Sequence, residues 1–267
     1  HRPPEVSGLV ANLELGDVQK ILELQPSPLV KDAYLHWDEL RHREPPEGLD
    51  HEKWWLGIKW ARQALLKSLP LVDKDGRPFR FGSPELVLID LHHIDQDAAG
   101  EIRSATEAAT PANRDRYLLK SVIEEAITSS QLEGASTTRK VAAEMLRLGR
   151  SPKDRSEQMI LNNFRAMRAI QGFKDKPLTP ARILAIHRMV SEDTLDDPQD
   201  VGQLRQTNNI HVVNNDDGTV LHQPPDHHEL PEHLERLCAF ANAGEDQRPF
   251  IHPVLRAILL HFMIGYD

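Results

Sequence analysis

The chain has 267 residues and a formal net charge of −9, because 41 Asp and Glu outnumber 32 Lys and Arg. A chain of this length forms one large domain or two ordinary ones, and it can bury enough surface to fold without disulfides or a structural metal. The acidic balance disfavours general nucleic-acid binding, which usually shows as a basic stripe, so nucleic acid is not an expected partner.

The single cysteine, Cys238, excludes a disulfide within this chain and indicates a reducing compartment. It lies on a helical apolar stripe, where a small buried side chain is expected. The most apolar run, residues 251–266, contains two histidines and an arginine and is shorter than the roughly 20 residues that cross a bilayer. No targeting segment is expected. We therefore predict a cytoplasmic protein without a membrane partner.

The N-terminal part combines a proline-rich lead-in with one clear helical pattern. Six prolines in residues 1–48 predict irregular chain with one or two short helices. Apolar residues at spacings of three and four predict a helix over residues 50–69, with Asp50 as its N-cap. Trp54 and Trp55 lie on that stripe. A ligand platform is one interpretation, but the helical spacing favours the core.

A region without regular periodicity follows. Residues 74–78 and 80–83 predict turns, and the apolar residues 85–91 fit either a strand or a short helix. His92 and His93, followed by two aspartates, form a candidate metal cluster. Neighbouring side chains on a helix point about 100° apart, so adjacent histidines chelate poorly and a solvated face is the favoured interpretation.

From residue 114 the chain is dominated by helical patterns. Apolar spacing and end signals predict helices at residues 114–134, 137–148, 151–172, 179–190, 230–241 and 252–265. Ser151 and Thr179 are expected N-caps, since each is followed by a proline at the first helical position.

One segment breaks the helical pattern. The β-prone residues 208–213 and 219–222 flank a run of Asn, Asp and Gly, and Asp217-Gly218 is among the strongest hairpin-turn dipeptides. A two-stranded hairpin alone is marginal in water, so we predict an exposed flap whose edge can pair with an extended peptide. From these residues alone, a plain surface loop is an equal alternative.

Three segments, by their order and spacing, resemble a Fic-domain protein. They are residues 129–134 (SSQLEG), residues 201–225 (VGQLR, the hairpin and Pro-Pro) with the apolar stripe after Leu230, and residues 249–267 (PFIHPVLRA continuing to HFMIGYD). The resemblance covers roughly residues 115–267, and the tryptophan-bearing segment is similar to the N-terminal region of bacterial Fic proteins.

The resemblance implies a mostly α fold, in which a Fic-type helical bundle carries one β-hairpin flap and follows a helical N-terminal region. Residues 1–114 would form that N-terminal region with its proline-rich lead-in. Residues 115–267 would comprise an inhibitory helix and the Fic domain.

The signature HPFxDGNGRxxR of the family does not occur in residues 1–267. The resemblance places it directly after Asp267, and the last predicted helix shows no C-cap signal before that residue. The catalytic residues are therefore unknown within this chain and expected beyond Asp267. His252 and His261 lie outside any matching motif and do not replace the motif histidine.

Fic proteins typically transfer AMP from ATP to a protein hydroxyl. The resemblance thus implies an adenylyltransferase that uses ATP and Mg²⁺ and modifies a Ser, Thr or Tyr of a target protein or of itself. In the family, the motif histidine takes the hydroxyl proton and the motif acidic residue holds Mg²⁺. Backbone N–H groups at a helix N-terminus bind the phosphates.

Glu133 matches the family's inhibitory motif, Ser/Thr-x-x-x-Glu-Gly/Asn, which here precedes the Fic core in the same polypeptide. The resemblance implies that this glutamate pairs with the second motif arginine, which otherwise binds the γ-phosphate of ATP. A carboxylate and a phosphate compete for the same guanidinium fork. Ser129 lies one turn earlier on the same face, and Gly134 is expected to end the helix.

The hairpin corresponds to the family's flap, with Asn209, Ile210, His211, Val212 and Val213 as its docking strand. The resemblance implies that its edge pairs with the extended target segment that presents the hydroxyl. Four histidines lie in or near the flap and are expected to be solvated: His211, His222, His227 and His228. No metal-ligating set is predicted in this chain.

Other functions stay open. In some members of the family the glutamate that Glu133 resembles positions a water for AMP removal, so a de-AMPylase is one alternative. Transfer of another phosphate-containing group is a second. A non-catalytic regulatory or binding module is the third, if the chain truly ends at Asp267. The target and the oligomeric state are not predicted, and a homo-oligomer is compatible with the sequence.

Overall fold

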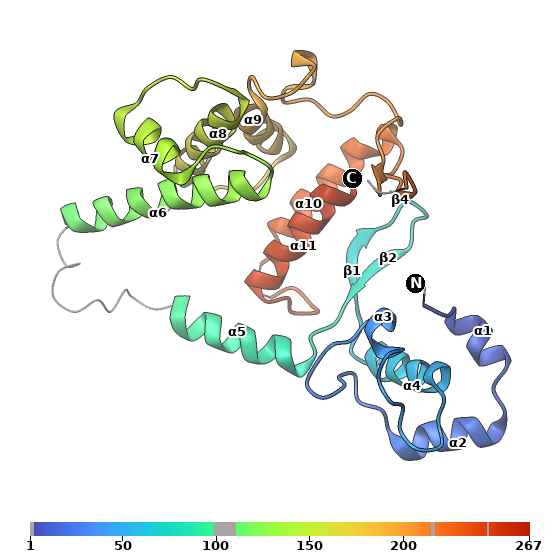
Figure 1. The fold of residues 1–267 in the computed structure, drawn as a ribbon. Coiled ribbons are helices and arrows are strands. Elements are labelled where there is room, and N and C mark those ends of the chain that lie inside the picture. The colour runs from blue at the N-terminus through green and yellow to red at the C-terminus, as the bar shows by residue number, and fades with distance from the viewer. Residues whose placement is uncertain (1–2, 99–110, 215–216, 245) are drawn as a thin grey trace. The chain divides into compact units, whose positions relative to one another are not determined.

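The computed structural model describes residues 3–98, 111–214, 217–244 and 246–267 (Figure 1). In these ranges the fold is mostly α, with eleven α-helices and two small antiparallel two-stranded sheets. This confirms the predicted mostly helical class with a β-hairpin near the C-terminal end. None of the helices in the described ranges combines the length and the apolarity that crossing a bilayer requires.

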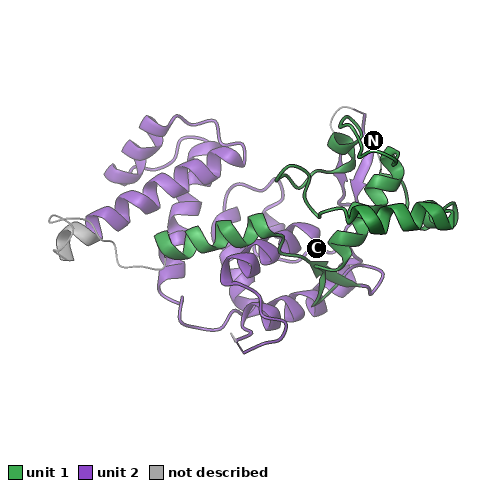
Figure 2. Ribbon diagram, turned by 90° about the horizontal axis from the view of Figure 1, so that it is seen from below, with its two compact units in different colours: residues 1–72, 78–100 green, residues 73–77, 101–267 purple. Residues whose placement is uncertain are grey.

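The chain divides into two compact units (Figure 2). The first comprises residues 1–72 and 78–100, and the second comprises residues 73–77 and 101–267. Each unit has an apolar core cluster of its own.

The core of the first unit is built around two neighbouring tryptophans. Trp54 and Trp55 are 6% and 4% exposed and pack with Ile21, Leu40 and Leu56. This confirms the interpretation of the tryptophans as core residues. The helices of the unit are α1 (Val6–Ala11), α2 (Leu15–Leu24), α3 (Trp37–Leu40), α4 (His51–Gln63) and α5 (Glu85–Ala98).

The start of α4 follows the prediction, but its end does not. The Asp50 carboxylate accepts a hydrogen bond from the Lys53 amide at 2.8 Å, as expected of an N-cap. The helix stops at Gln63, and the chain continues as β1 (Lys67–Val72), which pairs with β2 (Pro78–Phe81). The predictions of a helix to residue 69 and of a turn at residues 80–83 are therefore wrong. The burial of Leu69 and Leu71 alternates with exposed neighbours, which is the period of a strand.

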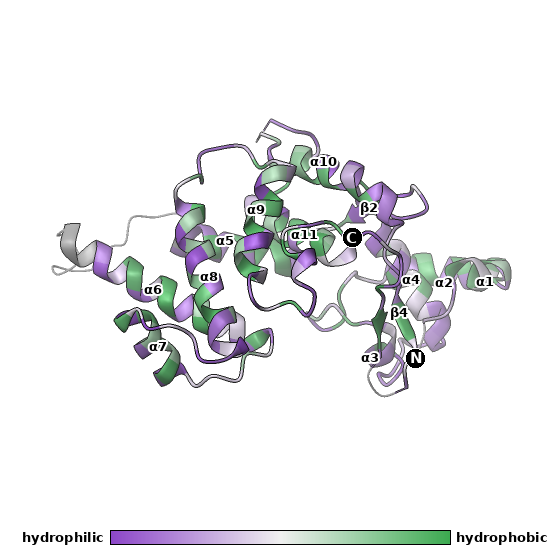
Figure 3. Cartoon of the chain, turned by 90° about the horizontal axis from the view of Figure 1, so that it is seen from above, coloured by the Kyte–Doolittle hydropathy of each residue, from purple (hydrophilic) through white to green (hydrophobic). Residues whose placement is uncertain are grey.

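The second unit contains α6 (Pro111–Leu132), α7 (Arg139–Leu148), α8 (Arg155–Gln171), α9 (Pro180–Ser191), α10 (Leu230–Ala241) and α11 (Pro253–Tyr266). Helix α6 packs against α7 and α8, α8 packs against α9, and α10 packs against α11. Apolar residues recur among polar ones along α6 and α8 (Figure 3), and their buried side chains form the core together with Ala142 and Met145 of α7. Cys238 on α10 is buried, as expected.

The N-caps of α9 and α8 show which local sequence signals determine where these helices begin. Thr179 accepts a hydrogen bond from the Arg182 amide, which confirms it as the N-cap of α9. Helix α8, however, begins at Arg155, and its N-cap is Asp154, which accepts from the Glu157 amide at 2.9 Å. The prediction of Ser151 as N-cap is wrong, because an equally good capping residue three positions later is followed by a glutamate at the third helical position.

Candidate functional site

The end of α6 forms a precise cap around the predicted inhibitory residues. The Ala135 amide donates to the Ser130 carbonyl at 2.9 Å, and the Gly134 amide donates to the Gln131 carbonyl at 3.1 Å. These two bonds define a Schellman motif, whose C′ position is left-handed. Gly134 occupies it with φ +97°, so glycine ends the helix as predicted and Glu133 becomes the C-cap residue.

Two side chains that the sequence analysis did not single out attach this helix end to α8. Ser130 is 3% exposed, and its Oγ accepts a hydrogen bond from Asn163 Nδ2 at 3.3 Å. Ser129 is half-buried, and its carbonyl accepts the Glu133 amide at 3.2 Å. The backbone of Glu133 is thus held on both sides, so the cap determines where its side chain begins.

The side chain of Glu133 is exposed. Among the residues that the structure describes, no basic group pairs with its carboxylate. An exposed carboxylate at a fixed helix end is free to accept a guanidinium, which is the partner that the family resemblance implies.

The predicted flap is a hairpin of β3 (Val212–Val213) and β4 (Val220–His222), which pair antiparallel. The Asn214 amide donates to the Thr219 carbonyl and the Gly218 amide donates to the Asn214 carbonyl, both at 2.8 Å. The sheet has two strands, so the outer edge of β3 has no strand partner within the described residues. Asn209, Ile210, His211, Val212 and Val213 are all exposed. An exposed, unpaired edge is the geometry that strand addition needs.

Arg205 binds both ends of the flap through hydrogen bonds. Its Nη1 donates to the Thr207 carbonyl and to Asn208 Oδ1, each at 3.1 Å, on the side that leads into the hairpin. Its Nη2 donates to the Pro225 carbonyl, on the side that leads out, and to the Asp267 carbonyl at 3.1 Å. The arginine of the Gly-x-x-Arg segment is therefore the anchor of the flap, a role that the sequence did not predict.

The flap is also joined to α11. His222 Nε2 lies 2.7 Å from the Tyr266 carbonyl, and the two rings are 4.8 Å apart. His233 Nδ1 lies 2.8 Å from Asp267 Oδ1, and the His233 side chain is only 8% exposed. The last turn of α11 is thus fixed to β4 and to α10. The site therefore brings together the flap, the end of α11 and Asp267.

Gly202, the glycine of the same Gly-x-x-Arg segment, packs directly on α9. Its amide donates to His187 Nδ1 at 3.1 Å, and its φ is +72°. A Cβ at this position would lie 2.8 Å from Arg188 Cβ. Both the backbone conformation and the close approach therefore require glycine.

Replacing Gly202 by alanine should lower the free energy of unfolding of the second unit by about 2–5 kcal/mol, the sum of a left-handed backbone and an overpacked contact. Urea denaturation of the variant measures this. Gly244→Ala is the matched control, because nothing lies within 4 Å of a Cβ there and the backbone is unstrained. Equal midpoints for the two variants would contradict the prediction.

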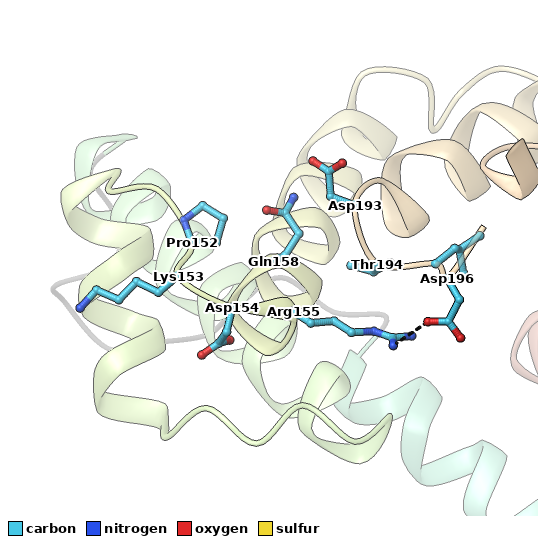
Figure 4. Close-up of a pocket in the computed structure, with 9 residues that line it drawn as sticks. Pro152, Lys153, Asp154, Arg155, Gln158, Asp193, Thr194 and Asp196 are labelled. Carbon is cyan, nitrogen blue, oxygen red and sulfur yellow. Dashed lines mark hydrogen bonds and ion pairs between the residues drawn. The ribbon is translucent and has the colours of Figure 1, made fainter. Parts of the chain in front are cut away.

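A polar pocket of about 340 Å³ lies at the N-terminus of α8. Figure 4 shows Lys153, Asp154 and Arg155 from that end and Asp193 and Asp196 from the segment after α9, with Arg155 paired to Asp196 at 3.2 Å. The pocket contains none of the predicted site residues. Arg155 and Asp196 are exposed and paired with each other, and Asp154 caps the helix, so we assign no catalytic role to the pocket.

His92 and His93 lie on an exposed face of α5, as the sequence analysis favoured. Within the described ranges, three side chains after the flap converge closely enough to share a cation: Asp226, His227 and His228. The amide and ring of His228, together with Asn208, hold the pKa of Asp226 far below its usual range. This carboxylate is therefore ionised at neutral pH.

Residues 177–267 match the Fic/DOC family model. The match contains α9, the flap, α10 and α11, and it leaves Ser129, Glu133 and Gly134 outside. No curated protein matches the chain.

Proposed function

We propose, from the premise that residues 177–267 form a Fic/DOC-family domain, that the protein transfers AMP from ATP to a protein hydroxyl and that Glu133 restrains this activity. The family match itself supports the coarser statement, a Fic-type enzyme that transfers a nucleotide or another phosphate-containing group. The observation that carries the finer proposal is the exposed, unpaired edge of β3, inside the matched segment and anchored at both ends by Arg205.

The flap supports a protein substrate rather than a small molecule. Main-chain N–H and C=O groups along β3 can pair with an extended segment of a target, and this fixes the register of the segment without reading its sequence. A hydroxyl held in register lies at a defined distance from the reacting phosphate, which lowers the entropic part of the barrier. A segment of a second copy of this protein satisfies the same geometry, so self-modification is included in the proposal.

ATP with Mg²⁺ would supply the transferable AMP group. The motif residues expected to hold its phosphates and the metal are absent from residues 1–267. Residues 1–267 would contribute the docking edge and the Glu133 carboxylate to the reaction. This carboxylate is exposed and has no basic partner among the described residues. A guanidinium of the motif would pair with that carboxylate, and the γ-phosphate would compete with Glu133 for it.

The requirement for the motif has a direct test. The codons that follow Asp267 in the gene should encode HPFxDGNGRxxR. A stop codon, or an unrelated sequence, at this point would overturn the proposed adenylyl transfer, because no phosphate-binding loop would be present.

The activity is tested with the natural gene product carrying Glu133→Gly, incubated with Mg²⁺ and ATP labelled at either the α- or the γ-phosphate. Adenylyl transfer predicts protein-bound label from α-labelled ATP and none from γ-labelled ATP. Label from γ-labelled ATP alone would instead identify a phosphoryl transferase. If the protein is folded and a range of candidate target proteins is present, the absence of both labels would favour a non-catalytic module.

A further inference from the structure

Four side chains bracket the flap at its base. Asn208 lies just before the docking strand, and Asp226, His227 and His228 lie just after β4, at the start of the 3₁₀ helix His227–Glu229. The sequence analysis treated the two histidines as solvated loop residues. The structure instead brings their Nδ1 atoms to one carboxylate, and this arrangement has no part in the proposed transfer reaction.

Short contacts join the four donor atoms in a row, from Asn208 Oδ1 through His227 Nδ1 and Asp226 Oδ1 to His228 Nδ1. Asp226 Oδ1 lies 2.8 Å from His228 Nδ1 and 3.4 Å from His227 Nδ1. Asn208 Oδ1 lies 3.0 Å from His227 Nδ1, and Asn208 Nδ2 donates to the second oxygen of Asp226 at 2.7 Å. The imidazole rings of His227 and His228 are 3.8 Å apart, with their Nδ1 atoms on the side of the carboxylate.

The 3.0 and 3.4 Å separations are those of neighbouring ligands in a metal coordination shell, whereas the 2.8 Å contact between Asp226 and His228 is a hydrogen-bond distance that would lengthen on binding. Bonds of about 2.0–2.2 Å to nitrogen and oxygen place neighbouring ligand atoms roughly 3–3.5 Å apart. The amides of His227 and His228 donate to Asn208 Oδ1 and Asp226 Oδ1, at 2.8 and 2.9 Å, so the backbone already orients both oxygen donors. Two imidazoles with one carboxylate and one amide oxygen favour a borderline cation such as Zn²⁺ over Mg²⁺, which prefers oxygen ligands and water.

We propose that Asn208, Asp226, His227 and His228 bind one divalent transition-metal ion of the zinc class, separate from the Mg²⁺ that accompanies ATP. The ion would take the place of the contacts between the two Nδ1 atoms and Asp226, and each bound imidazole would carry its N–H at Nε2. Because Asn208 precedes the flap and the other three ligands follow it, the metal closes the flap into a loop at its base. The docking strand between them becomes more rigid.

The test uses the natural gene product without a histidine tag, stripped with a chelator and titrated with Zn²⁺ by calorimetry at pH 7.5 in the absence of nucleotide. We expect one site that Asp226→Asn and His228→Ala each weaken by roughly tenfold or more. His211→Ala is the matched control, because it removes an exposed histidine of the same flap outside the donor set. It should leave the affinity unchanged.

The site would be overturned if Asp226→Asn and His228→Ala lost less affinity for Zn²⁺ than this, or if His211→Ala lost as much. It would also be overturned if the wild type showed no saturable Zn²⁺ binding. Thermal unfolding without metal identifies any variant that fails to fold, and Asn208→Ala then provides an independent test from the other side of the flap. Amide hydrogen exchange at Val212 and Val213 gives a second readout. Zn²⁺ should slow it in the wild type and not in Asp226→Asn, and unchanged exchange in both would contradict the loop closure.

Discussion

Glu133→Gly should raise the incorporation of AMP into protein by roughly ten- to hundred-fold over the wild type. The expected size follows from the interaction removed, since a charge-assisted hydrogen-bonded pair contributes about 1.5–3 kcal/mol and each 1.4 kcal/mol is a factor of ten. Without the carboxylate, the motif arginine would be free for the γ-phosphate. Incubation with α-labelled ATP, followed by gel autoradiography, measures the change.

Two glutamine variants separate charge from shape. Glu133→Gln keeps the size of the side chain and removes its charge, so its activity should lie between those of the wild type and Glu133→Gly. Glu125→Gln makes the same change on an exposed residue of α6, two turns earlier, and should behave as the wild type. Equal labelling of the wild type and both Glu133 variants would show that this residue does not inhibit the enzyme.

Glu157→Gln should lower the free energy of unfolding by about 2–3 kcal/mol at pH 7, because it breaks a buried ion pair and leaves Arg150 without its carboxylate. Glu157 is 3% exposed and accepts from both terminal nitrogens of Arg150 at 2.6 Å and from the Lys153 amide at 2.7 Å. The Arg150 side chain is 27% exposed, so the loss should be smaller than for a fully buried pair.

The same pair gives stability a defined pH dependence. The hydrogen bonds from Arg150 lower the pKa of Glu157 from 4.5 to about 2. The stabilisation is therefore fully present above pH 4.5 and is lost as the pH falls towards 2. The difference between the wild type and Glu157→Gln should shrink across that interval in urea titrations.

Asp196→Asn is the control for the ion pair, since Arg155 and Asp196 are 63% and 95% exposed. An exposed pair contributes about 1 kcal/mol or less. This variant should therefore differ little from the wild type at any pH. A gap between the wild type and Glu157→Gln that stays constant from pH 7 to pH 2.5 would contradict the role given to the Glu157 carboxylate.

Local signals in the sequence were sufficient wherever one helix face and its caps decided the structure. Helix α10 spans Leu230–Ala241, as predicted, and Thr179 caps α9. The pair of strands β1 and β2 was missed, because Leu65, Leu66 and Leu69 continue the helical spacing of α4. Pairing across the following turn, with Lys67 opposite Phe81, determines the strand, and a local pattern does not contain that information.

The candidate site divides in the same way. Gly134 ends α6 as its sequence indicated, and the hairpin forms around Gly218 with shorter strands than expected. The contacts that anchor the flap were not predictable, because they join residues distant in the chain. Arg205 and Asp267 are 62 positions apart, and His222 and Tyr266 are 44 apart. They form where the flap and the segment before it meet the end of α11.

The position of Glu133 at the C-cap of α6 has an electrostatic consequence. The last carbonyls of a helix carry partial negative charge, so a carboxylate at this end is unfavourable by about 0.3–1 kcal/mol. The helix end would be more stable with a neutral residue, and a variant released from inhibition need not be a weaker fold. The proposed inhibition by Glu133 therefore comes at a cost in the stability of α6, because the macrodipole of this helix disfavours a carboxylate at its C-terminal end.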